Sequence, residues 1–223
     1  MLKHTIAFAA VAGLVFALAP AAQSGTMTVG DPLIPAGLGV GDTFHLAFVT
    51  TTTTTGESAD VGYYNTFVNN AANDAGSLVA GKGWTWYAIV STTAGVNAID
   101  NTQTTGTGYP IYDVNGTKIA DDYLDLWDGT IDAELWIQQT GGLYEFGGTG
   151  EEVWTGAGPS GGQGPKGSLG ADYATYGCAN KYWEGSWIAN HNFYKTNLRP
   201  IYALSEPLLI VADAAAGAIF IVR

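Results

Sequence analysis

The chain has 223 residues, of which 47% are hydrophobic and 13% are charged, and its formal net charge is -12. Its 8 Lys and Arg residues argue against nucleic-acid binding, because neutralising phosphates requires clustered basic side chains. The acidic balance favours divalent cations as partners. The 31 glycines predict the many turns of an all-β or loop-rich α+β domain.

The first 22 residues have the pattern of a signal peptide. Lys3 and His4 give a short basic start, residues 6–18 are apolar, and Ala19-Pro20-Ala21 fits an A-x-A cleavage site. The sequence therefore predicts an exported protein that is secreted or displayed at the cell surface. We expect one domain over residues 23–212 and an apolar tail over residues 213–223.

Hydrophobic periodicity predicts one main helix over residues 61–75. Its apolar side chains recur at three- and four-residue spacing, Ser58 or Asp60 could cap its start, and Gly76 could end it. Segments rich in aromatic and β-branched residues predict strands, which we place at residues 43–50, 84–91, 110–112, 117–120, 183–188 and 200–211.

The connections between these elements are rich in turn-forming residues. Asn115-Gly116 predicts a tight hairpin turn. Residues 26–40 and 92–109 are expected to be irregular, and residues 140–152 and 156–170 form Gly-rich loops. Loops as long as the last one are uncommon in compact domains unless they carry function or are mobile.

Six aspartates fall within twenty residues and form the densest group of carboxylates in the chain. Ca²⁺ prefers six to eight oxygen ligands, so the group could build a calcium site, although its spacing does not match an EF-hand. Alternatively, these side chains cap backbone groups in turns. Both interpretations remain open for Asp113, Asp121, Asp122, Asp125, Asp128 and Asp132.

The seven Trp and twelve Tyr residues divide into two groups by context. Those in strand-like or turn segments are expected in the core, as are Ile119, Leu124 and Leu126 of the aspartate-rich stretch; the Trp residues concerned are Trp84, Trp86, Trp127 and Trp154. Those in looser, polar segments are the candidates for an exposed binding surface: Trp136, Tyr144, Trp183 and Tyr194.

No convincing catalytic constellation is visible, and we expect the protein not to be an enzyme. Residues 158–162 match the G-x-S-x-G pattern of a hydrolase elbow around Ser160, with Asp172 and His191 following. The elbow requires a strand before the serine and a helix after it, whereas both flanks here are Gly and Pro. His45, His191 and the single cysteine, Cys178, are expected to be structural, the last as a buried thiol.

Several sequence blocks together resemble a family of exported bacterial proteins. The blocks include Phe-His-Leu-Ala-Phe-Val-Thr, Trp-Tyr-Ala-Ile-Val-Ser-Thr, Asp-Leu-Trp-Asp-Gly-Thr, Val-Trp-Thr-Gly and Ile-Tyr-Ala-Leu-Ser-Glu. They are similar to secreted proteins of the PEP-CTERM-associated type, and their order more distantly resembles C-type-lectin-like domains of the endostatin type. The resemblance implies an α+β, C-type-lectin-like fold: a twisted antiparallel sheet with one main helix and long irregular loops.

The resemblance also implies a function. We expect an exported surface or extracellular-matrix protein that acts as a binding or structural module for a glycan, a protein or a second copy of itself. The first alternative is a Ca²⁺-dependent adhesive module that uses the aspartates of residues 113–132, and a hydrolase is a remote one. Contact with a membrane would come only through the targeting segment or the C-terminal tail.

Overall fold

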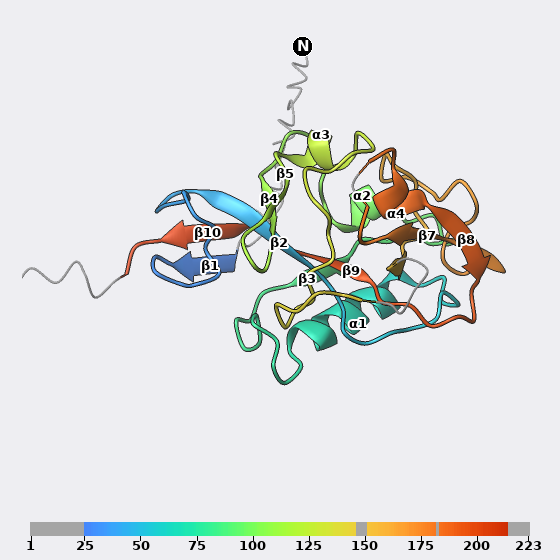
Figure 1. Cartoon of the computed structure of the whole chain (residues 1–223), viewed down its shortest axis with the longest axis horizontal. Coiled ribbons are helices and arrows are strands. Elements are labelled where there is room, and N and C mark those ends of the chain that lie inside the picture. The colour runs from blue at the N-terminus through green and yellow to red at the C-terminus, as the bar shows by residue number, and fades with distance from the viewer. Residues whose placement is uncertain (1–24, 146–150, 182, 214–223) are drawn as a thin grey trace, which may run out of the picture.

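The computed structural model describes residues 25–145, 151–181 and 183–213, and shows an α+β fold (Figure 1). The predicted signal peptide and residues 214–223 of the predicted tail lie outside these ranges. The main helix is α1 (Val61–Ala72), and the other helices are single turns: α2 (Ala98–Asn101), α3 (Tyr123–Leu126) and α4 (Ser186–Ala189).

Most regular structure is in strands, which form a mixed seven-stranded sheet and a small antiparallel sheet. The large sheet contains β1 (Gly25–Thr28), β2 (Thr43–Val49), β3 (Trp86–Ala88), β4 (Ile111–Asp113), β5 (Lys118–Ala120), β9 (Tyr202–Ser205) and β10 (Leu208–Val211). The small sheet contains β6 (Glu152–Trp154), β7 (Tyr173–Cys178) and β8 (His191–Tyr194).

The large sheet differs from the antiparallel sheet that we expected, because two of its strand pairs are parallel. β1 pairs in parallel with β10, and β2 pairs in parallel with β4. Parallel neighbours need a long crossover connection, and the chain from β2 to β4 supplies one through α1, β3 and α2. β9 pairs antiparallel with both β2 and β3.

The central strand β2 is buried on both faces. Phe44, Leu46 and Phe48 point into one apolar cluster, while Ala47 and Val49 point into a second cluster on the opposite face. Burying each large apolar side chain contributes roughly 1.5–3 kcal/mol. The sheet therefore separates two hydrophobic cores. The core that contains Phe44, Leu46 and Phe48 is covered by α1 (Figure 1).

The predicted helix is confirmed as α1, which ends at Ala72 with Asn73 as its cap. Asp60 accepts a hydrogen bond from the Gly62 amide and caps the start, as expected of an N-cap aspartate. On its inner face, Asn69 bonds both backbone groups of Trp86, at 3.0 Å to the nitrogen and 2.6 Å to the oxygen. A side chain of the helix thus provides hydrogen-bond partners for backbone groups on the outer edge of β3.

The hairpin predicted around Asn115-Gly116 is confirmed, with β4 and β5 paired across it. The strand expected at residues 183–188 is wrong, because the chain turns at Gly185 (φ 68°) and forms the single-turn helix α4. Four strands were not predicted: β1 lies mostly in a stretch expected to be irregular, and β6, β7 and β8 form the small sheet.

The C-terminal part of the described chain returns to the sheet. Residues 200–211 were expected to form strands and contain β9 and β10. The connection between these strands runs through Glu206, so this glutamate lies inside the folded domain. Across the residues that the structure describes, none of the helices has the length and apolar character required to cross a membrane.

Candidate functional site

Three of the six candidate aspartates cap backbone groups and are not among the converging carboxylates described below. Asp113 is buried in the hairpin turn, and its carboxylate accepts hydrogen bonds from the amides of Asn115 (2.8 Å) and Thr117 (2.9 Å). Asp122 is the N-cap of α3, and Asp128 accepts a hydrogen bond from the Thr130 amide. These contacts match the turn-capping alternative.

The other three aspartates converge. One carboxylate oxygen from each of Asp121, Asp125 and Asp132 lies within 4.8 Å of the others. The Lys118 ammonium contacts Asp121 and lies 3.2 Å from Asp132, so a cationic side chain already sits beside this group. Hydrogen bonds to Asp121 and Asp132 raise the pKa of Lys118, which stays charged.

Asp125 is the least exposed carboxylate of this convergent group. Its Oδ2 accepts a hydrogen bond from the Asp121 amide at 2.7 Å. Burial raises the pKa of Asp125, the amide bond opposes this shift, and the charges of Asp132, Asp128 and Asp121 add to it. The group could coordinate a hard divalent cation through these oxygens only if the Lys118 ammonium moved away.

The four aromatic candidates are not brought together. Tyr144 was expected at the surface, but it is 7% exposed and its hydroxyl donates to the Glu152 carbonyl, so that expectation is wrong. Trp136 is half-buried and packs against both apolar clusters. Trp183 and Tyr194 are exposed, at 44% and 54%. Trp183 precedes α4, whereas Tyr194 ends β8.

Tyr194 belongs to a cluster of exposed rings on the small sheet. It lies opposite Tyr173 in the β7–β8 pair, with ring centroids 4.4 Å apart and an interplanar angle of 37°. A hydrogen bond with Tyr194 raises the pKa of Tyr173. Phe193, 43% exposed, lies beside them on the other face of β8. We call Tyr173, Phe193 and Tyr194 the aromatic edge.

Of the aromatic edge, Phe193 is contacted by a buried arginine. The Arg199 guanidinium lies 4.4 Å from the ring centre of Trp154, 4.8 Å from that of Tyr176 and 5.1 Å from that of Phe193. Its Nε donates to Glu152 at 3.0 Å, and a second guanidinium nitrogen contacts the same carboxylate oxygen. Cation–π contacts of this kind hold a ring in place when the cation is itself fixed.

The position of β8 exposes the aromatic edge further. The small sheet has the order β6-β7-β8, so in the described part of the chain no strand pairs with the outer side of β8. Such an edge presents unpaired backbone groups as well as side chains. Tyr194 was expected at the surface from the sequence, whereas Tyr173 and Phe193 were not, because only the strand pairing shows that these residues lie together.

Ser160, Asp172 and His191, the residues considered for catalysis, each make local contacts that do not join them into a catalytic group. Ser160 lies in a turn closed by a hydrogen bond from Gly158 N to Gly162 O, with no strand directly before it and no helix directly after it in this fully described stretch. Asp172 pairs with Lys195 at 3.0 Å, and His191 Nδ1 contacts the Asn192 carbonyl. The geometry of a nucleophile elbow is therefore not formed.

Two further reactive side chains are enclosed. His45 is buried between the Ser205 carbonyl and the Tyr123 hydroxyl. Cys178 is a buried thiol, as expected, and burial raises its pKa, which lowers the fraction of reactive thiolate.

The burial of the hydrophobic residues in the aspartate-rich stretch depends on their positions in α3. Trp127 and Leu126 are buried as expected, but Leu124 is 62% exposed. In a single helical turn, positions three apart share a face, so Tyr123 and Leu126 face the core while Leu124 points outward.

The comparisons with known proteins do not add to this geometry. No protein-family model matches the chain, and the search of curated proteins gives no match.

Proposed function

We propose that the protein is an exported binding module of the cell surface or extracellular matrix, and that the aromatic edge binds a glycan. The observation that carries the proposal is the stack of two half-exposed tyrosines on an unpaired edge strand. Exposed apolar groups that gather on one surface mark interaction sites. Tyr173 and Tyr194 offer ring faces for the apolar side of a sugar and hydroxyls for its polar groups.

The charge of the protein restricts the glycan. A formal net charge of -12 repels sulfated and uronic acid chains. Neutral or amine-bearing sugars are therefore the class that the aromatic edge fits best. Because Arg199 fixes Phe193 from below, this ring loses little side-chain entropy when a ligand binds.

The signal-peptide pattern and the resemblance to exported proteins support the extracellular setting. We also propose that the fold is a C-type-lectin-like one. The features that support it are one main helix packed against a sheet, adjacent first and last strands, and long irregular loops that carry the small sheet. The chain lacks the paired cysteines and the Glu-Pro-Asn, Gln-Pro-Asp and Trp-Asn-Asp sugar motifs of many such domains. Sugar binding at the aromatic edge would therefore not use them.

A glycan array with matched variants tests the proposal. The parent protein should bind a subset of neutral or amino sugars, and Tyr173→Ala and Tyr194→Ala should each reduce that binding about tenfold, because each variant removes one stacking face. Tyr109→Ala is the control, since Tyr109 is 41% exposed but lies on the chain before β4. Circular dichroism confirms that each variant is folded. Equal binding by all variants would sink the proposal.

A second candidate function follows from the convergence of Asp121, Asp125 and Asp132. In this alternative the protein is a Ca²⁺-dependent adhesive module, and Ca²⁺ displaces the Lys118 ammonium from Asp121 and Asp132 and binds all three carboxylates. Millimolar Ca²⁺ should then raise the melting temperature. Lys118→Gln should enlarge the shift, and Asp125→Ala should abolish it. A melting temperature that does not respond to Ca²⁺ in either the parent or Lys118→Gln removes this candidate.

A further inference from the structure

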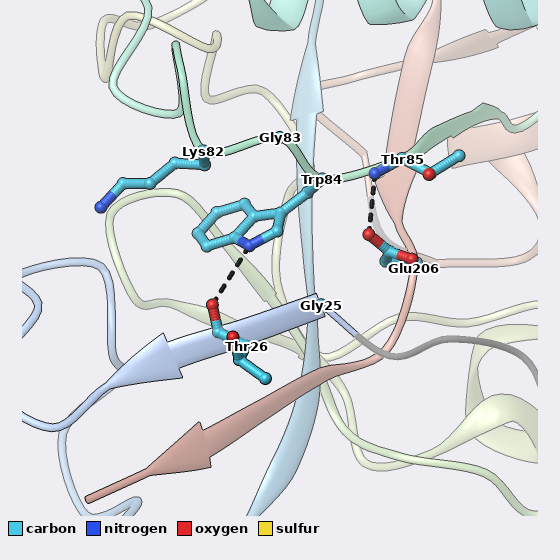
Figure 2. Close-up of a pocket in the computed structure, with 7 residues that line it drawn as sticks. All are labelled: Gly25, Thr26, Lys82, Gly83, Trp84, Thr85 and Glu206. Atoms are coloured by element: carbon cyan, nitrogen blue, oxygen red, sulfur yellow. Dashed lines mark hydrogen bonds between the residues drawn. The ribbon is translucent and has the colours of Figure 1, made fainter. Parts of the chain in front are cut away.

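A polar pocket lies far from the aromatic edge, where the first strand meets the body of the fold. Gly25 and Thr26 of β1, residues 82–85 and Glu206 surround about 510 Å³ (Figure 2). This volume is in the range of small-ligand sites. The pocket therefore has the size for a compact ligand such as one or two sugar rings.

The indole of Trp84 forms the centre of the pocket and is fixed in position. Its Nε1 donates to the Thr26 carbonyl at 3.3 Å, and the side chain is 7% exposed. Gly25 permits this arrangement, because a Cβ there would lie 2.8 Å from Trp84 Cδ1 and 3.2 Å from a Glu206 oxygen. A larger residue at this position would close the pocket.

Charged groups lie on opposite sides of the indole (Figure 2). On one side, Glu206 Oε1 accepts a hydrogen bond from the Thr85 amide at 2.9 Å. A carboxylate has about four acceptor positions in all, so Glu206 retains capacity for a ligand. On the other side, the Lys82 ammonium bonds Asp31 at 2.5 Å and lies 5.7 Å from the ring centre of Trp84.

The charge of the pocket favours a cation. Lys82 is neutralised by Asp31, which leaves the Glu206 carboxylate as the uncompensated charge among the lining residues. The net charge of the whole chain has the same sign. A positively charged ligand is therefore attracted to this place, and an ammonium group can both pair with Glu206 and lie against an indole.

We propose that this pocket binds a small ligand that carries an ammonium group beside hydroxyl groups, the chemistry of an amino sugar. The ammonium group pairs with Glu206, and the hydroxyls bond the threonine side chains and backbone groups of the lining. Trp84 supplies a rigid apolar wall. The pocket shares no residue with the aromatic edge. An experiment can therefore disprove ligand binding at one site without disproving it at the other.

NMR titration of the full mature chain with glucosamine tests the proposal. Glucosamine should shift the Trp84 indole N–H and the Thr85 amide signals. Glucose and glucuronate at equal concentration should bind at least about tenfold more weakly than glucosamine, because they lack the ammonium group. Equal binding of glucose or stronger binding of glucuronate overturns the assignment. An absence of shifts at Trp84 and Thr85 with millimolar glucosamine also overturns it.

Matched variants locate the charge that matters. Glu206→Gln keeps an oxygen to accept from the Thr85 amide but removes the negative charge, so it should weaken glucosamine about tenfold or more. Glu57→Gln, an exposed glutamate outside the pocket lining, should leave binding unchanged. Lys82→Met should strengthen binding, because it removes the nearby positive charge. If Glu206→Gln is folded and binds glucosamine as the parent does, the proposal is wrong.

Discussion

Arg199 and Glu152 join the core of the small sheet to its surface. The Arg199 Nε donates to Glu152 Oε2 at 3.0 Å, and the guanidinium lies between the buried Trp154 ring and the exposed Phe193 ring. The arginine side chain is 8% exposed. A largely buried pair of this kind gives the Phe193 ring a fixed support.

Removing the arginine should therefore destabilise the protein. Arg199→Met keeps an apolar stem but leaves the Glu152 carboxylate without its partner in a partly buried position, which should cost about 3 kcal/mol of unfolding free energy. Adding Glu152→Gln to that variant should recover part of the loss. Urea unfolding measures both. A stability of Arg199→Met equal to that of the parent would show that the pair is not a support.

His45 should make stability depend on pH. Its Nδ1 lies 2.7 Å from the Ser205 carbonyl, so this nitrogen carries the proton, and Nε2 accepts from the Tyr123 hydroxyl at 2.6 Å. Both ring positions are satisfied in the neutral form. Burial lowers the pKa of His45 to about 4, and the bond to Ser205 opposes this shift.

The direction follows from proton linkage. Between pH 6.5 and 4 the unfolded chain binds a proton at His45 and the folded chain does not. The free energy of unfolding therefore decreases as the pH is lowered through this window, by up to about 3 kcal/mol. Asp113 and Asp125 have raised pKa values and act in the opposite sense. The measurement is therefore the difference from His45→Gln, with the exposed His191→Gln as control. Parallel pH curves for the parent and His45→Gln would contradict the expectation.

Asp113 should behave as a turn cap. Asp113→Ala leaves the amides of Asn115 and Thr117 without their acceptor and should cost about 2 kcal/mol. Asp113→Asn retains an accepting oxygen, and burial already disfavours the charged form, so its cost should be clearly smaller. Thermal unfolding compares the two variants. If Asn is as damaging as Ala, the carboxylate charge itself is required and capping is not its role.

Gly177 should not tolerate a side chain. It lies in β7 where α4 approaches, and a Cβ at this position would overlap the Trp187 carbonyl oxygen. Gly177→Ala should therefore lower the unfolding free energy by about 3 kcal/mol or more, since the clash is with backbone. Gly39→Ala, with nothing within 4 Å, should change it by less than about 0.5 kcal/mol. Similar melting temperatures for the two variants would contradict this packing.

The elements that the sequence predicts correctly are those defined by local patterns. The apolar residues along one face of α1 and the Asp60 cap lie close together in the sequence, so their pattern can be recognised locally. The hairpin of β4 and β5 likewise follows from the turn residues Asn115-Gly116. The single-turn helix α4 lacks a periodic pattern because it is too short to show one. It begins after a left-handed Gly185, where the sequence suggested a continuing strand.

The features that the sequence does not predict depend on pairing between distant segments. Besides its two tyrosines, β7 contains Ala, Thr, Gly and Cys, and its burial comes from β6, α4 and the Gly-rich loop rather than from its own periodicity. The parallel partner of β2 lies beyond α1 and β3 in the chain. For the same reason Tyr194 could be named as a surface residue, while its stacking partner Tyr173 could not.

The most direct test of the account is to locate glycan binding on the protein by NMR. The glycan that binds most strongly on the array is titrated into the mature chain, and amide shifts are recorded. We predict that the largest shifts fall on Tyr173, Phe193 and Tyr194 and that they disappear in Tyr194→Ala. Shifts confined to other parts of the structure, or unchanged shifts in Tyr194→Ala, would contradict the claim that the aromatic edge is the binding surface.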